Sequence, residues 1–167
     1  SVLAALFILI PLCYAPAAFV AFLVRERESK SKHLQTISGV SPHLYWLATL
    51  TWDLTLYTFL TALLMSCFYV YGNQSVYVTT SESAAATFLL ILAYGFSVIP
   101  LCYLYSFLFV NHSTAQISIM AINFGTGFIA VLAVLIMESI PETQAAAGTL
   151  RNIFRLFPPY LIGEGFI

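Results

Sequence analysis

The sequence predicts an all-α integral membrane protein with about four transmembrane helices. Of its 167 residues, 60% are hydrophobic and only 8% are charged, whereas soluble domains carry about 25% charged residues. Four of the six basic residues gather in one segment, Arg25–His33, and no charged residue precedes it. A core of this size cannot bury so much apolar side chain, so lipid must surround the long apolar runs.

The first span is expected at residues 2–24, because a helix that crosses the hydrocarbon needs about 20 apolar residues. Pro11 and Pro16 lie inside it and are expected to bend it. Residues 25–43 follow as a polar loop, which must lie in water. Its clustered Arg and Lys indicate the cytoplasmic side, since cytoplasmic loops carry an excess of these residues.

Within this loop, residues 28–38 are expected to form a short helix. Its only apolar side chains, Leu34 and Ile37, are three residues apart and therefore share a face. Gly39 stands where a C-terminal cap would, and Pro42 prevents the helix from continuing. The apolar face is too small to bind a bilayer but large enough to dock on another protein.

Residues 45–71 predict the second span, with Trp46 beginning an interfacial aromatic belt. The polar segment 72–83 is then expected on the opposite, outer face. It contains the glycosylation sequon Asn73-Gln74-Ser75, which makes Asn73 a candidate acceptor.

The third span is expected at residues 84–110, capped by Ser81 or Ser83, with kinks at Gly95 and Pro100. Residues 111–114 predict a tight cytoplasmic turn.

The fourth span is then expected at residues 115–137. It contains the polar Asn123, and its Gly125 and Gly127 permit close helix contact.

Residues 138–167 do not resemble a span. Ser139 and Glu142 have the spacing of a capping box with Pro141 in the first turn, which predicts a helix to about Phe157 that Pro158-Pro159 stops. Because this helix carries two arginines, we expect an outer re-entrant hairpin shielded by protein or water. An apolar run is under way at Ser1 and another begins near the last residue, so we expect the chain to be a fragment of a larger membrane protein.

Asp53 is the only acidic residue within a predicted span. An intramembrane carboxylate is costly and indicates function by default. The alternative is that the helix starts in the cytosol and places Asp53 at headgroup depth beside Trp52. We interpret its role as structural in either case, because a carboxylate without a titratable partner makes a poor proton relay.

Other chemistries find little support in the sequence. His33 and His112 are too far apart in sequence to indicate a metal site, and the three cysteines each lie in an apolar run, as small hydrophobic residues do. No basic field suits nucleic acid. A phosphate-binding loop needs Gly-Lys-Ser/Thr, but both lysines follow serines, so the chain is expected to have no ATPase or other enzymatic activity of its own.

Several motifs together resemble the transmembrane part of subfamily A of the ATP-binding-cassette transporters, and its second membrane half in particular. The main one is the run Lys32-His33-Leu34-Gln35-x-x-Ser38-Gly39-Val40, followed by Tyr45-Trp46 and Trp52-Asp53. Further matches are Tyr94-Gly95-x-Ser97-x-x-Pro100, Ser113-Thr114-Ala115 and Phe157-Pro158 with Gly163-x-Gly165.

The resemblance implies an ABC-2-like, type V exporter fold, of which this chain would hold spans two to five of one six-span half. It also implies that ATP and magnesium bind in a nucleotide-binding domain outside the chain. The charged loop would then be the coupling helix, with Lys32, His33, Leu34, Gln35, Ile37 and Gly39 facing that domain. The expected partners are this domain, the other membrane half and a lipid substrate such as a phospholipid or sterol. A channel or ion-coupled carrier, and a non-transporting membrane scaffold, remain the alternatives.

Overall fold

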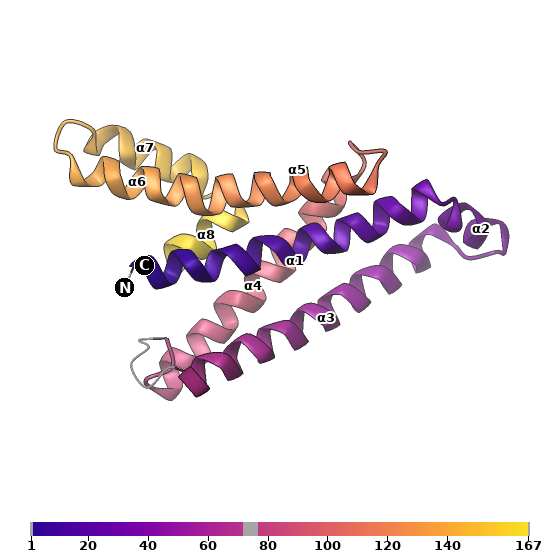
Figure 1. Ribbon diagram of the computed structural model, residues 1–167, viewed down its shortest axis with the longest axis horizontal. Coiled ribbons are helices and arrows are strands. Elements are labelled where there is room, and N and C mark those ends of the chain that lie inside the picture. Colours follow the sequence, from indigo (N-terminus) through magenta and orange to yellow (C-terminus); the bar gives the residue numbers. More distant parts are fainter. Residues whose placement is uncertain (1, 72–76, 167) are drawn as a thin grey trace.

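The computed structural model describes residues 2–71 and 77–166, and the regular elements in that part of the chain are helices (Figure 1). Their bounds, in chain order, are α1 (Val2–Glu28), α2 (Ser31–Ile37), α3 (Pro42–Tyr71), α4 (Ser81–Ser106), α5 (His112–Phe124), η1 (Gly125–Ile129), α6 (Ala130–Ser139), α7 (Gln144–Phe154) and α8 (Pro158–Gly165).

Four stretches in this part of the chain are long and apolar enough to cross a membrane: Ile8–Glu28, Pro42–Val70, Ser81–Ser106 and His112–Ser139. The last one consists of α5, η1 and α6, where the π-helix η1 joins two α-helices without a break. The predicted all-helical fold with four spans is therefore confirmed.

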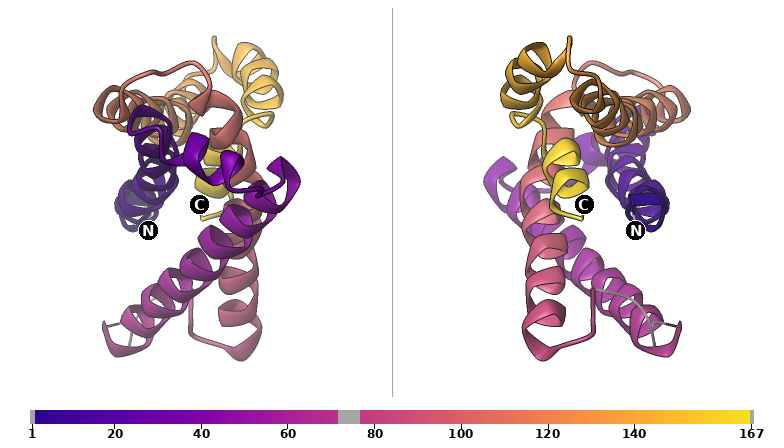
Figure 2. Two further views of the ribbon diagram at one scale, coloured as in Figure 1. Left: turned by 90° about the vertical axis from the view of Figure 1, so that its right-hand side faces the viewer. Right: turned by 90° about the vertical axis from the view of Figure 1, so that its left-hand side faces the viewer.

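α1 packs most extensively against α5 and also packs against α4, while α3 packs against α4 (Figures 1 and 2). The connections of the bundle lie at two opposite ends (Figure 1). One end holds α2, the last turn of α4 and the start of α5. The other end holds the start of α4 and the connection from α6 to α7. Successive connections thus alternate between the two ends, as expected for loops that lie in turn on the cytoplasmic and the outer side.

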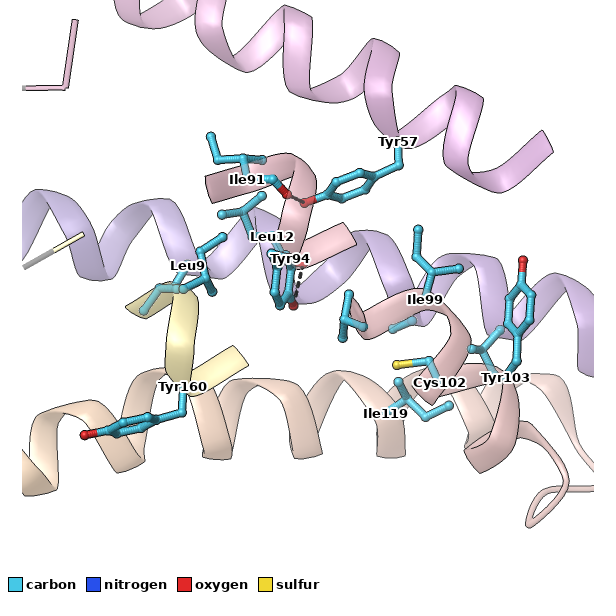
Figure 3. Close-up of a cluster of buried hydrophobic side chains, with 14 of the residues drawn as sticks. Leu9, Leu12, Tyr57, Ile91, Tyr94, Ile99, Cys102, Tyr103, Ile119 and Tyr160 are labelled. Atoms are coloured by element: carbon cyan, nitrogen blue, oxygen red, sulfur yellow. Dashed lines mark hydrogen bonds between the residues drawn. The ribbon is translucent and has the colours of Figure 1, made fainter. Parts of the chain in front are cut away.

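The prolines of α1 do not interrupt the helix, and at Pro16 a neighbouring helix replaces the lost hydrogen bond. Pro16 has no N–H, which leaves the carbonyl of Leu12, four residues earlier, without its helical donor. The hydroxyl group of Tyr94 in α4 donates to that carbonyl at 3.3 Å (Figure 3). Such replacement by a neighbour is what makes proline tolerable within a membrane helix.

Gly95 serves the packing of α3 against α4. The helix α4 runs unbroken through Gly95 and Pro100. A Cβ atom at Gly95 would overlap the ring of Tyr57 in α3. The Tyr57 ring therefore lies in the space that the missing side chain leaves, and its hydroxyl donates to the carbonyl of Ile91 at 3.0 Å (Figure 3).

The cap of the third span differs from the one expected. Thr80 caps α4, because its extended backbone directs Oγ1 to accept from the N–H of Ser83 at 3.1 Å. Ser81 and Ser83 themselves lie inside the helix, so neither is the cap. The helix also ends at Ser106, four residues before the expected boundary.

The tight turn expected at residues 111–114 is mostly helical. The side chain of Asn111 accepts from the N–H groups of Ser113 and Thr114 at 2.9 and 3.3 Å, so that α5 starts at His112. An asparagine that satisfies two N–H groups in this way is a strong start signal.

The capping box expected at Ser139 is wrong. Ser139 is the last residue of α6, and its hydroxyl donates within that helix to the carbonyl of Leu135 at 2.9 Å. The apolar run before it extends the helix, and Pro141 then prevents continuation. α7 begins only at Gln144, and the two prolines at 158–159 start α8 rather than merely stopping the helix before them.

Small residues bring α8 against η1. A Cβ atom at Gly127 would lie 3.1 Å from the carbonyl oxygen of Pro159, and one at Gly163 would lie 3.1 Å from the carbonyl oxygen of Gly127. These two glycines therefore allow close backbone approach, as expected for Gly127. Gly125 has nothing within 4 Å of such an atom and plays no part in the contact.

Four charged side chains connect α6, α7 and α8. Arg151 Nη2 lies 2.8 Å from Glu138 Oε1, and Arg151 Nε lies 3.2 Å from Glu164 Oε1. Arg155 donates two hydrogen bonds, of 2.9 and 2.7 Å, to the two oxygens of Glu164. The arginines that make this segment too polar for lipid are thus paired with carboxylates.

The Glu164 network predicts an acid-sensitive hairpin. The hydrogen bonds from Arg155 lower the pKa of Glu164 from its ordinary value of 4.5. A lowered pKa in the folded state means that the stabilisation is present above the unfolded-state pKa and is lost as pH falls through the folded-state value. The unfolding midpoint of wild type should therefore exceed that of Glu164→Gln at pH 7, and the difference should shrink below about pH 4.5. A difference that does not change with pH would contradict this role of the ion pair.

Candidate coupling site

The charged segment that the sequence places in a loop is partly helical. Residues 25–28 form the last turn of α1, and α2 is limited to Ser31–Ile37 instead of the expected 28–38. The break between the two helices lies at Lys30, whose backbone is left-handed with φ of 60°. The charged residues 25–28 thus belong to the same helix as the apolar run that precedes them.

α2 ends in a Schellman motif at the expected glycine. The N–H of Gly39 donates to the carbonyl of Thr36 and that of Val40 donates to the carbonyl of Gln35, both at 3.2 Å. Gly39 has φ of +98°, a conformation that glycine adopts at no steric cost. Pro42 then begins α3, where its fixed φ suits a first helical position.

The apolar face of α2 is exposed. Leu34 is 66% exposed and Ile37 is 70% exposed, and no residue of α2 is buried. The helix is therefore fixed at its ends, while its two large apolar side chains have no buried contact with the described chain.

Three consecutive residues at the end of α1 each contact a different helix. Their partners are Tyr45 Oη of α3, which donates to Glu26 Oε2 at 2.6 Å; the carbonyl of Ser106 in α4, which accepts from Arg27; and His112 Nδ1 of α5, which lies 2.6 Å from Glu28 Oε2. The last turn of α1 thereby holds the same ends of α3, α4 and α5 together.

Aromatic rings hold the cations of this end in place. The ammonium group of Lys32 in α2 lies 4.1 Å from the ring centroid of Trp46 and 4.5 Å from that of Tyr45. Burial lowers the pKa of Lys32, and the nearby Arg27 contributes in the same direction. The guanidinium of Arg27 lies 5.2 Å from the ring centroid of Phe107. The Lys32 contacts thus attach α2 to the start of α3, and the Arg27 contact attaches the end of α1 to the end of α4.

Asp53 is buried between α3 and α4. Only 5% of it is exposed, and its Oδ2 accepts a hydrogen bond from the hydroxyl of Tyr103. None of the salt bridges in the described part of the chain involves Asp53. This geometry is that of a packing contact between two spans, and the structural role of Asp53 stays a prediction.

Replacing Asp53 should show that its acceptor oxygen, rather than its charge, stabilises the bundle. Asp53→Asn keeps an acceptor for Tyr103 and should change the free energy of unfolding little. Asp53→Leu leaves the Tyr103 hydroxyl unpaired, which costs about 1–3 kcal/mol. Thermal unfolding of the purified full-length protein measures both. Equal losses in the two variants would show that the negative charge itself is needed.

The remaining candidate residues lie apart from one another. Asn123 is buried in the fourth span, where its amide donates to the Sγ atom of Cys102 at 3.8 Å. His33 is exposed on α2, and Asn73 lies outside the described residues. Within the described ranges, no group of three or more His, Cys, Asp or Glu side chains could hold a metal ion.

Sequence reasoning missed the residues that connect the helices: Glu26, Arg27, Glu28, Tyr45, Tyr103 and His112. The sequence indicated only that the charged segment and the turn beginning at residue 111 lie on the same, cytoplasmic side. It did not indicate which side chains of the two meet. Which residue meets which depends on helix rotation, which the sequence pattern leaves undetermined.

Comparisons with known proteins agree with the helical architecture. The model of the ABC-2 family of transporter proteins matches residues 1–167. The chain is 35% identical over 166 residues to the bovine "retinal-specific phospholipid-transporting ATPase ABCA4", covering 98% of the chain and 7% of that protein. It is 33% identical over 169 residues to the human "phospholipid-transporting ATPase ABCA7", covering 100% of the chain and 8% of that protein.

A third relative is the human "ATP-binding cassette sub-family A member 2", 32% identical over 170 residues, covering 100% of the chain and 7% of that protein. The chain thus spans less than a tenth of the length of these relatives, all of which are subfamily A members. From its four apolar spans and the family model that covers it from end to end, this chain belongs to the ABC-2 family of transporter proteins and forms membrane-spanning structure of such a transporter.

Proposed function

We propose that the chain is part of the membrane domain of an ATP-driven lipid exporter, in which α2 is the coupling helix. The observation that carries the proposal is the exposed face of Leu34 and Ile37 on a helix whose ends are fixed by a Schellman cap and cation–π contacts. Two relatives are named as phospholipid-transporting ATPases, which supports a phospholipid as the substrate.

The partner of this face is a nucleotide-binding domain outside the chain, where ATP and magnesium bind. When that domain moves, it shifts α2 and with it the end of α1, because only Ser29 and Lys30 separate the two helices. The contacts of Glu26, Arg27 and Glu28 then transmit the shift to α3, α4 and α5. The helices thus tilt together, so that a lipid can pass along them.

Reconstitution of the full-length protein in lipid vesicles tests this function. The expected result is ATP hydrolysis that phospholipid stimulates, together with ATP-dependent movement of phospholipid between leaflets. Ion flux across the vesicle membrane without lipid movement would favour a channel or carrier. The absence of any transport, with ATP hydrolysis that does not respond to lipid, would favour a scaffold.

A further inference from the structure

A small pocket lies between the last turn of α1 and α2, at the end of the bundle that carries α2 (Figure 1). Its volume is about 260 Å³, and it is lined by Arg27, Lys30, Lys32, His33 and Thr36. Sites for drug-sized ligands measure about 300–1,000 Å³, so this pocket suits one small group of a ligand rather than a whole lipid. A lining of three cations, one histidine and one hydroxyl group indicates an anion.

The cations of this pocket have no anionic partner in the described part of the chain. None of the salt bridges there involves Arg27, Lys30 or Lys32. Arg27 donates to the carbonyl of Ser106, and the ammonium group of Lys32 lies over two aromatic rings of α3. These partners are neutral, so they hold the cations in place without cancelling their charge.

The two carboxylates of the same segment are engaged elsewhere. Glu26 Oε2 accepts from a tyrosine hydroxyl of α3, and Glu28 Oε2 lies 2.6 Å from a histidine of α5. Neither glutamate lines the pocket. Burial and the neighbouring Arg27 lower the pKa of Lys32, while Glu26 acts in the opposite direction with a smaller effect. Positive charge therefore predominates in the pocket.

The pocket and the apolar face of α2 lie on opposite sides of that helix. Lys32 and Thr36 are four residues apart and share one face, whereas Leu34 and Ile37 are three residues apart and share another. At about 100° per residue, the side chain of Leu34 is rotated by about 200° from that of Lys32. A ligand in the pocket would therefore leave the apolar face free for a partner domain.

The pocket lies where the membrane surface is expected. The apolar run of α1 ends at Val24, and Arg27 follows one helical turn later. Tyr45 and Trp46, whose rings contact Lys32, are of the types that are enriched at membrane–water boundaries. Basic residues clustered immediately beyond a membrane helix attract phosphorylated lipid headgroups.

We propose that this pocket binds a phosphate monoester group, of the kind that phosphorylated inositol lipids and free inositol phosphates carry. A monoester has a charge of about −1.5 to −2 and three strong acceptor oxygens, which match the several cationic donors of Arg27, Lys30 and Lys32. The bound group would connect α1 to α2 across the break between them. This inference goes beyond the proposed function, because its ligand is bound beside the coupling helix and is not the transported lipid.

Binding to the full-length protein in phosphatidylcholine nanodiscs tests the site without ATP. The probes are short-chain phosphatidylinositol bisphosphate, short-chain phosphatidylinositol and free inositol trisphosphate, with empty nanodiscs as the blank. We expect the bisphosphate to bind about tenfold or more tightly than phosphatidylinositol, because charge-assisted hydrogen bonds are the strong ones. A lipid that binds more tightly than the free trisphosphate assigns the ligand to the membrane, whereas equal affinities assign it to the soluble phosphate.

Two variants and one control assign the binding to the pocket. Lys30→Asn removes one cation and keeps the left-handed backbone, with φ of 60°, that asparagine tolerates. Thr36→Asp adds a carboxylate to the wall. Each should weaken binding of the bisphosphate about tenfold. Arg25→Gln removes a positive charge from an exposed residue that does not line the pocket, and solvent screening should keep its effect within about twofold.

The outcomes separate this inference from the proposed function. Equal affinities for phosphatidylinositol bisphosphate and phosphatidylinositol overturn the site, and so do equal losses in Lys30→Asn and Arg25→Gln. Either result leaves the export function standing, because the measurement involves no ATP and no transport. Selective binding by a protein that moves no lipid upholds the site and refutes the export function.

Discussion

Leu34→Asp in the full-length protein is expected to abolish lipid-stimulated ATP hydrolysis and lipid export while leaving the membrane domain folded. The Leu34 side chain is 66% exposed, so the substitution removes no buried contact within the described chain. Burying one leucine in a partner is worth about 1.5–3 kcal/mol, which corresponds to a loss of about tenfold or more in the docked population. A buried charge in the same contact adds to the loss.

The measurement compares stimulated ATPase activity, export and surface level. Thr36→Asp is the matched control, because it adds the same charge to α2 on a side away from Leu34. Normal export by Leu34→Asp would show that α2 is not the coupling helix. A loss of surface expression would instead show that Leu34 has a folding role.

The second large effect is expected from Gly95→Ala, which adds a single methyl group. Because that methyl would overlap the Tyr57 ring, α3 and α4 must separate or Tyr57 must leave its buried position. Overpacking of this kind costs about 1–3 kcal/mol. We expect a lower unfolding midpoint and less protein at the cell surface.

A matched control and a double variant make the Gly95 prediction specific. Gly125→Ala adds the same methyl group at a helical position with nothing within 4 Å, and it should be neutral or slightly stabilising, since alanine is the better helix former. Combining Gly95→Ala with Tyr57→Ala should cost less than the sum of the two single changes. Additive losses would mean that the ring does not set the helix distance.

The four spans could be predicted because runs of about 20 apolar residues leave lipid as the only suitable solvent. The helix ends could not be predicted with the same accuracy. Thr80, Ser81 and Ser83 can all cap a helix, and the choice depends on which residue has the extended backbone. At Ser139 the apolar run extended the helix past a motif that would otherwise have begun one.

The candidate site could be predicted only in its local part. Leu34, Ile37 and Gly39 follow from helix periodicity and capping, which depend on neighbours in the sequence. The contact between Glu28 and His112 spans 84 positions, and the one between Tyr94 and the Leu12 carbonyl spans 82. Such contacts depend on how each helix is rotated against its neighbours.

The π-helix η1 sets the rotational phase of everything that follows it. A π turn holds one residue more than an α turn, so α6 is rotated by about 100° relative to an uninterrupted continuation of α5. This offset lets one span present Asn123 to α4 and, a few turns later, Glu138 to Arg151. Deleting one residue among Gly125–Ile129 would restore a regular helix and still span the bilayer. Glu138 would then point away from α7. The extra residue is therefore the reason that one continuous span can contact α4 and α7 on different sides.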